Sequence, residues 1–296
     1  MISRRLMLAA VPMIGLARGA GAAAPMMLPT SLLMTPLMTP LMTPAQRLET
    51  MIRMRGSTDG RMCAGWLDAI RETVVDGEIV PFCRILAGTL SRFEKRGDLY
   101  EATVLEVAYY LDPQTGAMLD TFKFPGAAEA VPVPRYRTGP TKVRYGVGFD
   151  EWEETNPAGK NAPSANFAPR ASVNLQRDIG IPSFDKGSLF LRSDEYGRVY
   201  PDRAAPPTIF YREWMLWRAA ARDVLEGKEP SVPADFMYSA LSSWRPWMKM
   251  GSIKGHTAEN GRGAKLRGPE DFPAELRDLI SRKDPDILRD SARALG

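Results

Sequence analysis

The sequence predicts a mainly β fold of the α+β class: an antiparallel, barrel-like meander with helices at the N-terminal and C-terminal ends. Three observations support this prediction. Short runs of alternating apolar and polar residues follow one another along the middle of the chain, turn residues separate them, and helical periodicity is confined to the two ends. Sequential short strands with turn signals favour a barrel or sandwich over a parallel α/β sheet.

The first ordered element is predicted to be a helix that begins after Thr43. Thr43 is a good N-cap, Pro44 suits the first helical position, and Gln46 completes a capping box. Leu48, Met51 and Ile52 then form its apolar side.

The clearest strand signal is the alternation from Tyr100 to Tyr110. Asp112 to Gly116 follows as a turn, because Pro and Gly stand where a tight turn needs them. One face of the predicted strand carries Thr103, Leu105, Val107 and Tyr109, and the other carries Ala102, Val104, Glu106, Ala108 and Tyr110. Further strands are predicted at 82–93, 118–124, 141–149, 172–179, 188–192 and 208–220.

The last third of the chain mixes signals. Residues 211–221 fit a strand, but Trp214, Trp217 and Ala221 also fit a helical stripe. We expect loops at 238–255 and at 261–263, the latter because it reads Gly-Arg-Gly. Helices are predicted at 273–282 and 285–294, the second capped by Asp284 and the first docked on the sheet by Leu276, Leu279 and Ile280.

The amino terminus resembles an export signal. Arg4 and Arg5 precede an apolar run of about ten residues, which is too short to span a membrane. We expect a twin-arginine signal over 1–22 that engages the twin-arginine export machinery, is cleaved near Ala22, and leaves a periplasmic or secreted protein without a stable membrane anchor. A general secretory signal with a chance arginine pair is the alternative.

A low-complexity linker is predicted over 23–44, followed by a single β-rich domain over 45–296. The linker repeats Leu-Met-Thr-Pro, and proline at every fourth position opposes regular structure. Its methionines could bind cuprous copper, although a slipped repeat in a tether explains the pattern more simply.

The charge balance argues against a nucleic-acid partner. The whole chain has a formal charge of +4, and three of its arginines lie within the predicted signal. The mature chain is therefore near neutral, without the basic clusters that bind nucleic acid.

The residue types offer little for metal or cofactor chemistry. His256 is the single histidine and Cys63 and Cys83 are the two cysteines, so an ordinary zinc site is excluded. No glycine-rich nucleotide motif is present. We expect no metal and no cofactor, and two buried thiols in preference to a disulfide.

Glu106 is the strongest catalytic candidate. It shares a face of the predicted strand with alanines, Val104 and Tyr110, a pattern typical of a carboxylate that points into an enclosed space. Burial would raise its pKa and suit it to general acid or base catalysis, with Tyr110 beside it. The alternatives are a solvent-facing Glu106 or an ion pair with Arg144 or Arg192. Glu213 and Asp120 are weaker candidates of the same kind.

Aromatic residues are concentrated late in the chain. Trp244 and Trp247 are predicted on a loop over one end of the barrel, where they could grip a ligand. Predicted ligand contacts are Trp217, Glu213, Trp244, Trp247 and Arg192. His256 follows this loop and could donate or accept a proton. Core packing is the alternative role for the tryptophans.

Three segments carry a resemblance to a known family: Arg55 to Gly60 (RGSTDG), Asp112 to Asp120 (DPQTGAMLD) and Trp244 to Gly251 (WRPWMKMG). They resemble the bacterial family named domain of unknown function 1838. The resemblance implies a single domain and a strand at 211–221. It supplies no catalytic residues.

These observations lead to one functional hypothesis and its alternatives. The protein is predicted to be a cofactor-free lyase, isomerase or hydrolase that acts on a small apolar or aromatic molecule in a barrel pocket. A periplasmic binding or carrier protein with the same pocket is the alternative. A structural or partner-binding protein would instead present a shallow surface.

Overall fold

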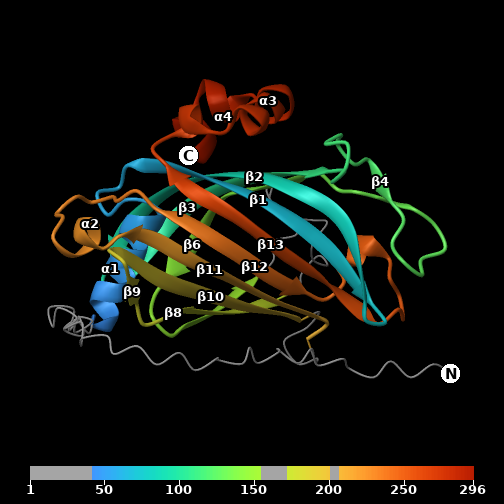
Figure 1. Cartoon of the computed structure of the whole chain (residues 1–296), viewed down its shortest axis with the longest axis horizontal. Helices are drawn as coiled ribbons and strands as arrows, with labels where there is room; N and C mark the ends of the chain where they lie inside the picture. Colours follow the sequence, from blue (N-terminus) through green and yellow to red (C-terminus); the bar gives the residue numbers. More distant parts are fainter. Residues whose placement is uncertain (1–41, 155–171, 201–206) are drawn as a thin grey trace, which may run out of the picture. The chain divides into compact units, whose positions relative to one another are not determined.

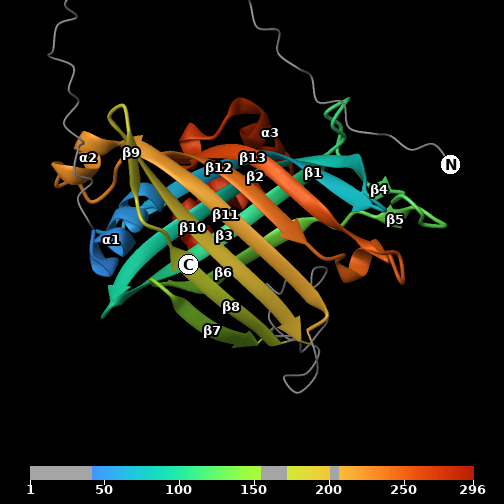
Figure 2. The same cartoon turned by 60° about the horizontal axis from the view of Figure 1, so that its bottom comes forward.

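A computed structural model describes residues 42–154, 172–200 and 207–296 of the chain. The predicted signal and nearly all of the predicted linker lie outside these described residues. The described chain folds into one large antiparallel sheet that is nearly closed into a barrel, with short helices near its ends (Figures 1 and 2). The predicted fold class is therefore confirmed.

The sheet is built from two meanders in which neighbouring strands are also consecutive in the chain. The spatial order is β6-β3-β2-β1-β13-β12-β11-β10-β8-β7. The first meander contains β1 (Met62–Val75), β2 (Glu78–Arg96), β3 (Leu99–Leu111) and β6 (Tyr136–Tyr145). The second contains β7 (Phe149–Glu154), β8 (Ser172–Ile179), β10 (Ser188–Tyr200), β11 (Ile209–Ala220), β12 (Asp235–Ser242) and β13 (Gly255–Leu266).

The two meanders meet where β1 pairs with β13. The edge strands of the described sheet are β6 and β7, which are neighbours in sequence. A short β9 (Ser183–Asp185) adds to β10. The strand expected at 118–124 is reduced to β4 (Thr121–Phe122), which pairs with β5 (Val131–Pro132) in a separate two-stranded sheet.

Strands β1, β5, β7, β9, β12 and β13 were not predicted from the sequence. The expected Gly-Arg-Gly loop lies inside β13, where the glycines serve close approach rather than a turn. A Cβ on Gly261 would come 2.5 Å from Ala69, and one on Gly263 would come 2.1 Å from the Trp66 carbonyl oxygen. Glycine in a strand marks such contacts as well as turns, so its presence alone misled the prediction. Residues 211–221 are strand as far as Ala220, and the short helix α2 (Ala221–Leu225) follows.

The helix α1 (Pro44–Arg55) begins as predicted. The Gln46 amide donates to Thr43 Oγ1 at 3.3 Å, and the Thr43 amide donates to Gln46 Oε1 at 2.8 Å. Its apolar side is buried, with Met51 and Ile52 almost fully enclosed. The helix lies at one end of the barrel, close to β8 and β11 (Figure 2).

Three C-terminal helices cover the outer face of the first meander (Figure 1): α3 (Ala274–Lys283), α4 (Asp286–Arg289) and α5 (Ser291–Leu295). Leu276, Leu279 and Ile280 pack there as predicted. The second predicted helix is divided at Asp290, whose side chain caps α5.

Asp284 does not cap α4 with its side chain. It is buried and accepts hydrogen bonds from Tyr109 at 2.7 Å and Arg137 at 2.9 Å, and it also pairs with Arg135. The carboxylate therefore joins the helical tail to β3 and β6.

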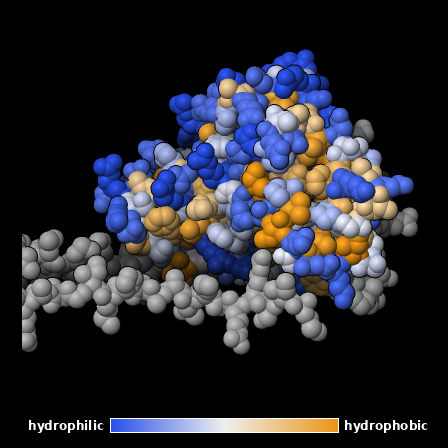
Figure 3. Space-filling view, turned by 45° about the vertical axis from the view of Figure 1, so that its right-hand side comes forward, coloured by the Kyte–Doolittle hydropathy of each residue, from blue (hydrophilic) through white to orange (hydrophobic). Residues whose placement is uncertain are grey.

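The remaining surface mixes polar and apolar groups. On the face in Figure 3, apolar residues form small clusters separated by hydrophilic ones. Two single-turn helices, η2 (Pro246–Met248) and η3 (Pro269–Asp271), lie in the connections around β13. None of the helices in the described part of the chain has the length and apolar composition needed to cross a membrane.

Candidate functional site

The barrel contains an open cavity of about 350 Å³, a volume within the usual range for a small-molecule site. Its wall is unusually rich in charged and phenolic groups. Among the lining residues are four glutamates, four arginines and five tyrosines: Glu106, Glu195, Glu213, Glu259, Arg55, Arg71, Arg177, Arg245, Tyr110, Tyr136, Tyr145, Tyr211 and Tyr238.

Strand alternation places Glu106 on this wall. Glu106 lies opposite Thr89 of β2 and Thr138 of β6, and all three side chains line the cavity. The intervening residues of β3, such as Leu105 and Val107, face outward and are buried beneath the C-terminal helices. Both faces of β3 are therefore enclosed, which explains why apolar residues appear on both.

A row of charged side chains crosses six adjacent strands at one level of the barrel. Arg71 of β1 is in register with Glu259 of β13, and Arg177 of β8 is in register with Glu195 of β10. Glu213 of β11 stands directly opposite Glu195. In register order the row reads Arg71, Glu259, Ala240, Glu213, Glu195 and Arg177.

The two ends of this row are ion pairs. Arg71 Nε donates to Glu259 Oε1 at 2.6 Å, and Arg177 Nε donates to Glu195 Oε2 at 2.6 Å. The Tyr211 hydroxyl adds a hydrogen bond to Glu195 at 3.2 Å. These buried charges are therefore neutralised locally, as burial requires.

Glu106 and Glu213 differ from the paired glutamates. Neither forms a hydrogen bond or an ion pair with another residue in the described ranges. Burial raises the pKa of Glu106 to about 7, with Arg55 opposing the shift. Burial also raises the pKa of Glu213, and the neighbouring carboxylates, Glu195 foremost, raise it further. Both side chains can therefore hold or release a proton near neutral pH.

Arg55 brings a positive charge into the cavity from the last position of α1. Its guanidinium lies 5.1 Å from the ring centre of Tyr145 and 6.0 Å from that of Trp217. Its Nη1 also approaches the Met215 sulfur at 3.7 Å. Within the described chain, no carboxylate forms an ion pair with it.

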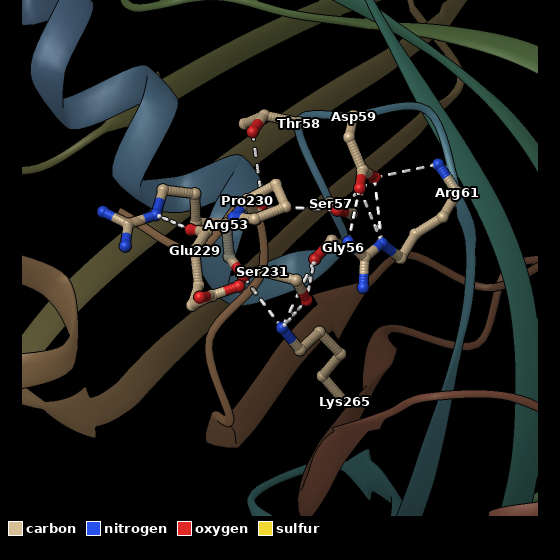
Figure 4. Close-up of polar contacts among 10 residues, drawn as sticks. All are labelled: Arg53, Gly56, Ser57, Thr58, Asp59, Arg61, Glu229, Pro230, Ser231 and Lys265. Carbon is tan, nitrogen blue, oxygen red and sulfur yellow. Dashed lines mark hydrogen bonds and ion pairs between the residues drawn. The ribbon is translucent and has the colours of Figure 1, made fainter. Parts of the chain in front are cut away.

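A cluster of backbone contacts holds the end of α1 in place (Figure 4). Lys265 Nζ donates to the carbonyl of Arg53 at 2.8 Å and to Ser231 Oγ at 2.6 Å. Gly56 ends the helix where a Cβ would meet the ring of Phe93 at 2.4 Å. The Arg55 to Gly60 segment, one of the three that suggested a family, therefore forms the anchored turn that fixes Arg55.

Lys265→Met is expected to lower the free energy of unfolding by about 2 kcal/mol, because it leaves partly buried carbonyl groups at the end of α1 without their charged donor. Burial already lowers the pKa of Lys265 to about 8. Urea unfolding monitored by fluorescence measures the change. Lys254→Met, at an exposed position just before β13, is the control, and equal midpoints for the two variants would contradict this role.

The structure brings four of the predicted site residues together. Glu106, Tyr110, Glu213 and Trp217 all line the cavity. Arg144 and Arg192, the suggested partners of Glu106, instead pair with Glu151 and Asp194.

The other predicted site residues lie outside the cavity lining. His256 precedes the buried Thr257 on β13, so strand alternation turns His256 away from the interior. Arg192 is an outward-facing residue that stacks on Trp214. Asp120 is exposed.

Trp244 and Trp247 pack in an aromatic cluster near the start of β2 rather than on the cavity wall. Their ring centres lie 6.3 Å and 5.7 Å from that of Phe124, and the Trp244 indole donates to the Ile253 carbonyl at 2.8 Å. This is the core-packing alternative to ligand binding.

Several cavity residues were missed from the sequence. Glu259 was hidden because β13 was not recognised, since residues 261–263 within it were interpreted as a loop. Arg71 was hidden because β1 was not recognised. The alternation around Glu195 in β10 was the one usable signal. Nothing local distinguishes Arg55 from other helix-terminal arginines.

The two cysteines are not among the residues that line the cavity. Cys63 and Cys83 are both buried and free, and Cys63 is in register with Ser91 whereas Cys83 is in register with Arg71. Burial raises the pKa of Cys83 to about 12, so this thiol is protonated at neutral pH. No group of three or more histidine, cysteine or acidic side chains with metal-binding geometry occurs among the residues that the structure covers.

Comparison with known proteins adds one finding. No curated protein matches the chain. The matching family model spans β10 from Glu195 through the helical tail, and so includes Glu213, Glu259 and Lys265 but not Glu106 or Arg55. Over residues 195–293 the chain is similar to the family described as protein of unknown function (DUF1838).

Proposed function

We propose that the protein is a small-molecule enzyme that works by proton transfer, a lyase, isomerase or hydrolase, with Glu106 and Glu213 as its acid and base. The observation that carries the proposal is the pair of enclosed carboxyl groups without hydrogen-bonding or ionic partners in the described chain. A structural carboxylate in such a place is ordinarily paired, as Glu195 and Glu259 are.

The environment suits the two carboxyls to different tasks. A pKa near 7 gives Glu106 comparable populations of acid and base at neutral pH, which is the optimum for proton transfer. The pKa of Glu213 is also raised, in part because Glu195 stands directly opposite it on the neighbouring strand β10. Glu213 can then serve as the proton donor while Glu106 accepts.

The tyrosines of the wall complete this chemistry. Burial raises the pKa of Tyr110 and of Tyr136, so both hydroxyls keep their protons. They are therefore hydrogen-bond donors that can stabilise negative charge developing on a substrate oxygen.

The cavity suits a ligand with an aromatic or aliphatic body and polar groups. Trp217 and Phe236, whose ring centres are 4.5 Å apart, supply an aromatic wall. The row of charged side chains supplies a polar wall. Export to the periplasm or beyond, inferred from residues 1–22, remains part of the proposal.

The test uses isotope labels, because they report proton transfer whatever the substrate is. The protein is incubated with a small-molecule extract of its own source in heavy water and, separately, in water labelled with heavy oxygen. We expect at least one compound to gain deuterium, lose the elements of a small molecule, or gain labelled oxygen, as measured by mass spectrometry. These outcomes correspond to an isomerase, a lyase and a hydrolase.

Two controls make the result decisive. Heat-denatured protein removes the fold, and Glu106→Gln removes one proton-transfer group. A label that enters equally with wild type and Glu106→Gln would rule out Glu106 as the base. A compound that co-purifies unchanged in native mass spectrometry, with no other compound gaining label or losing the elements of a small molecule, would contradict the enzyme and support a carrier protein.

A further inference from the structure

We infer that Arg55 forms a carboxylate-binding subsite in the barrel cavity, so that the natural ligand is a small organic acid with an apolar or aromatic body. This inference names the substrate class for the proposed function and rests on it for the reaction, but the binding site is tested separately.

Arg55 differs from Arg71 and Arg177, which line the same cavity. Arg71 and Arg177 each have a glutamate within 2.6 Å. Arg55, by contrast, contacts aromatic faces and a thioether, and none of the described residues pairs with it as a carboxylate. A charged group with burial of this kind ordinarily has a counterion, and a ligand carboxylate in the cavity would supply it.

The aromatic rings around the Arg55 guanidinium also favour a bound carboxylate. A guanidinium that stacks on aromatic rings leaves its N–H groups directed outward in its own plane, where they form paired hydrogen bonds with a carboxylate. The rings of Tyr145 and Trp217 both lie close to the Arg55 guanidinium. The buried indole nitrogen of Trp217 itself has no acceptor among the described residues.

Arg55 lies where two spaces adjoin. Arg55 lines both the main cavity and an adjoining recess of about 50 Å³. Tyr145, Arg177, Glu195 and Glu213 are also shared by the two spaces. A ligand that joins the two spaces therefore passes Arg55.

The backbone that carries Arg55 is held firmly in place. Arg55 is the last residue of a helix whose end is fixed by Lys265 and by the Arg53 side chain, which donates to the Val224 carbonyl at 2.9 Å and the Glu229 carbonyl at 2.8 Å. The guanidinium is thus attached to an anchored backbone, so binding a carboxylate costs little ordering of the chain.

A single carboxylate fits this site better than a phosphate. Glu106, Glu195 and Glu213 also face the same cavity, and a doubly charged anion would be repelled by those that are ionised. Arg55, which forms no ion pair with any of the described residues, matches one negative charge.

The probes are benzoate and phenylacetate, compared with benzamide and phenylacetamide as neutral controls of the same shape, with inorganic phosphate as the competing anion. Isothermal titration calorimetry on the wild-type protein is expected to show binding of the carboxylates and at least about tenfold weaker binding of the amides. Equal binding of acids and amides, preference for phosphate, or no binding of either acid would overturn the inference.

Variants locate the site. Arg55→Met should weaken benzoate binding by about tenfold or more. Arg55→Lys keeps the charge but cannot form two parallel hydrogen bonds to a carboxylate, so its affinity should lie between those of Arg55→Met and wild type. Arg218→Met, at an exposed arginine on the outer face of β11 that pairs with Asp235, should bind as wild type does. Equal affinities of Arg55→Met and Arg218→Met would place the acid elsewhere.

The pH dependence of binding gives a readout that needs no substitution. Because Glu106 and Glu213 gain negative charge as pH rises through neutrality, benzoate binding should weaken by about tenfold between pH 6 and pH 9. The charged and titratable groups that face the cavity with Arg55 come from every surrounding element: Arg71, Glu106, Tyr110, Tyr136, Tyr145, Arg177, Glu195, Tyr211, Glu213, Tyr238, Arg245, Glu259 and Lys265. Affinity that is constant over this range would contradict the site.

The binding and reaction results can fail separately. Glu106→Gln keeps Arg55 and should bind benzoate at least as tightly as wild type. If the acids bind through Arg55 but no compound gains isotope or loses the elements of a small molecule, the proposed enzyme is wrong and the subsite stands. If isotope enters a compound that carries no acidic group, the proposed enzyme stands and the carboxylate subsite is wrong.

Discussion

Glu106→Gln is expected to abolish most of the turnover while making the folded protein more stable above neutral pH. A positioned general acid or base contributes about 10²- to 10⁴-fold to rate, and Gln keeps the shape but cannot transfer the proton. The rate of label incorporation into the compound identified with wild type measures this loss.

The gain in stability follows from the raised pKa. Folded Glu106 holds its proton up to about pH 7, whereas the unfolded chain releases it near 4.5. The wild-type fold is therefore favoured by this group below pH 4.5, and that contribution is lost as pH rises through 7. Gln remains neutral, so at pH 9 the variant should be more stable by up to about 3 kcal/mol, and at pH 4.5 the two should be alike.

Glu101→Gln is the matched control on the same strand. Glu101 pairs with Lys142 at 2.7 Å on the surface, and that hydrogen bond lowers its pKa, the opposite of Glu106. Its replacement should leave turnover unchanged and bring no gain in stability at alkaline pH. If Glu106→Gln instead destabilises the protein at pH 9, Glu106 has a charged partner and is structural.

Glu259→Gln is expected to destabilise the protein by about 3 kcal/mol at neutral pH, because it removes the counterion of a buried arginine. Arg71 and Glu259 have side chains that are only 16% and 8% exposed, and their closest atoms are 2.5 Å apart. Chemical unfolding at pH 7 measures the change.

The double variant Arg71→Met with Glu259→Gln is the control for this prediction. Removing both charges should recover part of the lost stability, because no unpaired buried cation is left to destabilise the fold. If the single and double variants are equally destabilised, the loss comes from packing. The same substitution, Glu to Gln, thus has opposite effects on stability at two positions of one cavity wall.

The fold could be predicted from sequence where the pattern was local. The alternation around Glu106 and the capping box at Thr43 each depend on residues a few positions apart, and both elements were correctly identified. The prediction of β13 failed because its glycines permit close packing against β1 and β12. Glycines required for such packing look the same in the sequence as glycines required for a turn.

The site was predictable only in part, for a similar reason. Alternation assigns Glu106 to a face of its strand, but the charged row that contains Glu213 depends on the register among six strands. Register between strands is a long-range property, so the pairing of Arg71 with Glu259 leaves no trace in either segment alone. His256 was overvalued because its position on β13 could not be known without that strand.

The order of the strands also determines when the cavity can exist. Sheet neighbours follow one another in the chain within each meander, whereas the β1 and β13 ladder joins segments far apart: Arg71 and Glu259 are separated by 188 residues. Such long-range closure is the slow, entropically costly step in forming β proteins. The two meanders can therefore assemble early, but the cavity is complete only once β1 and β13 pair. A ligand that binds there therefore reports the finished barrel rather than any folding intermediate.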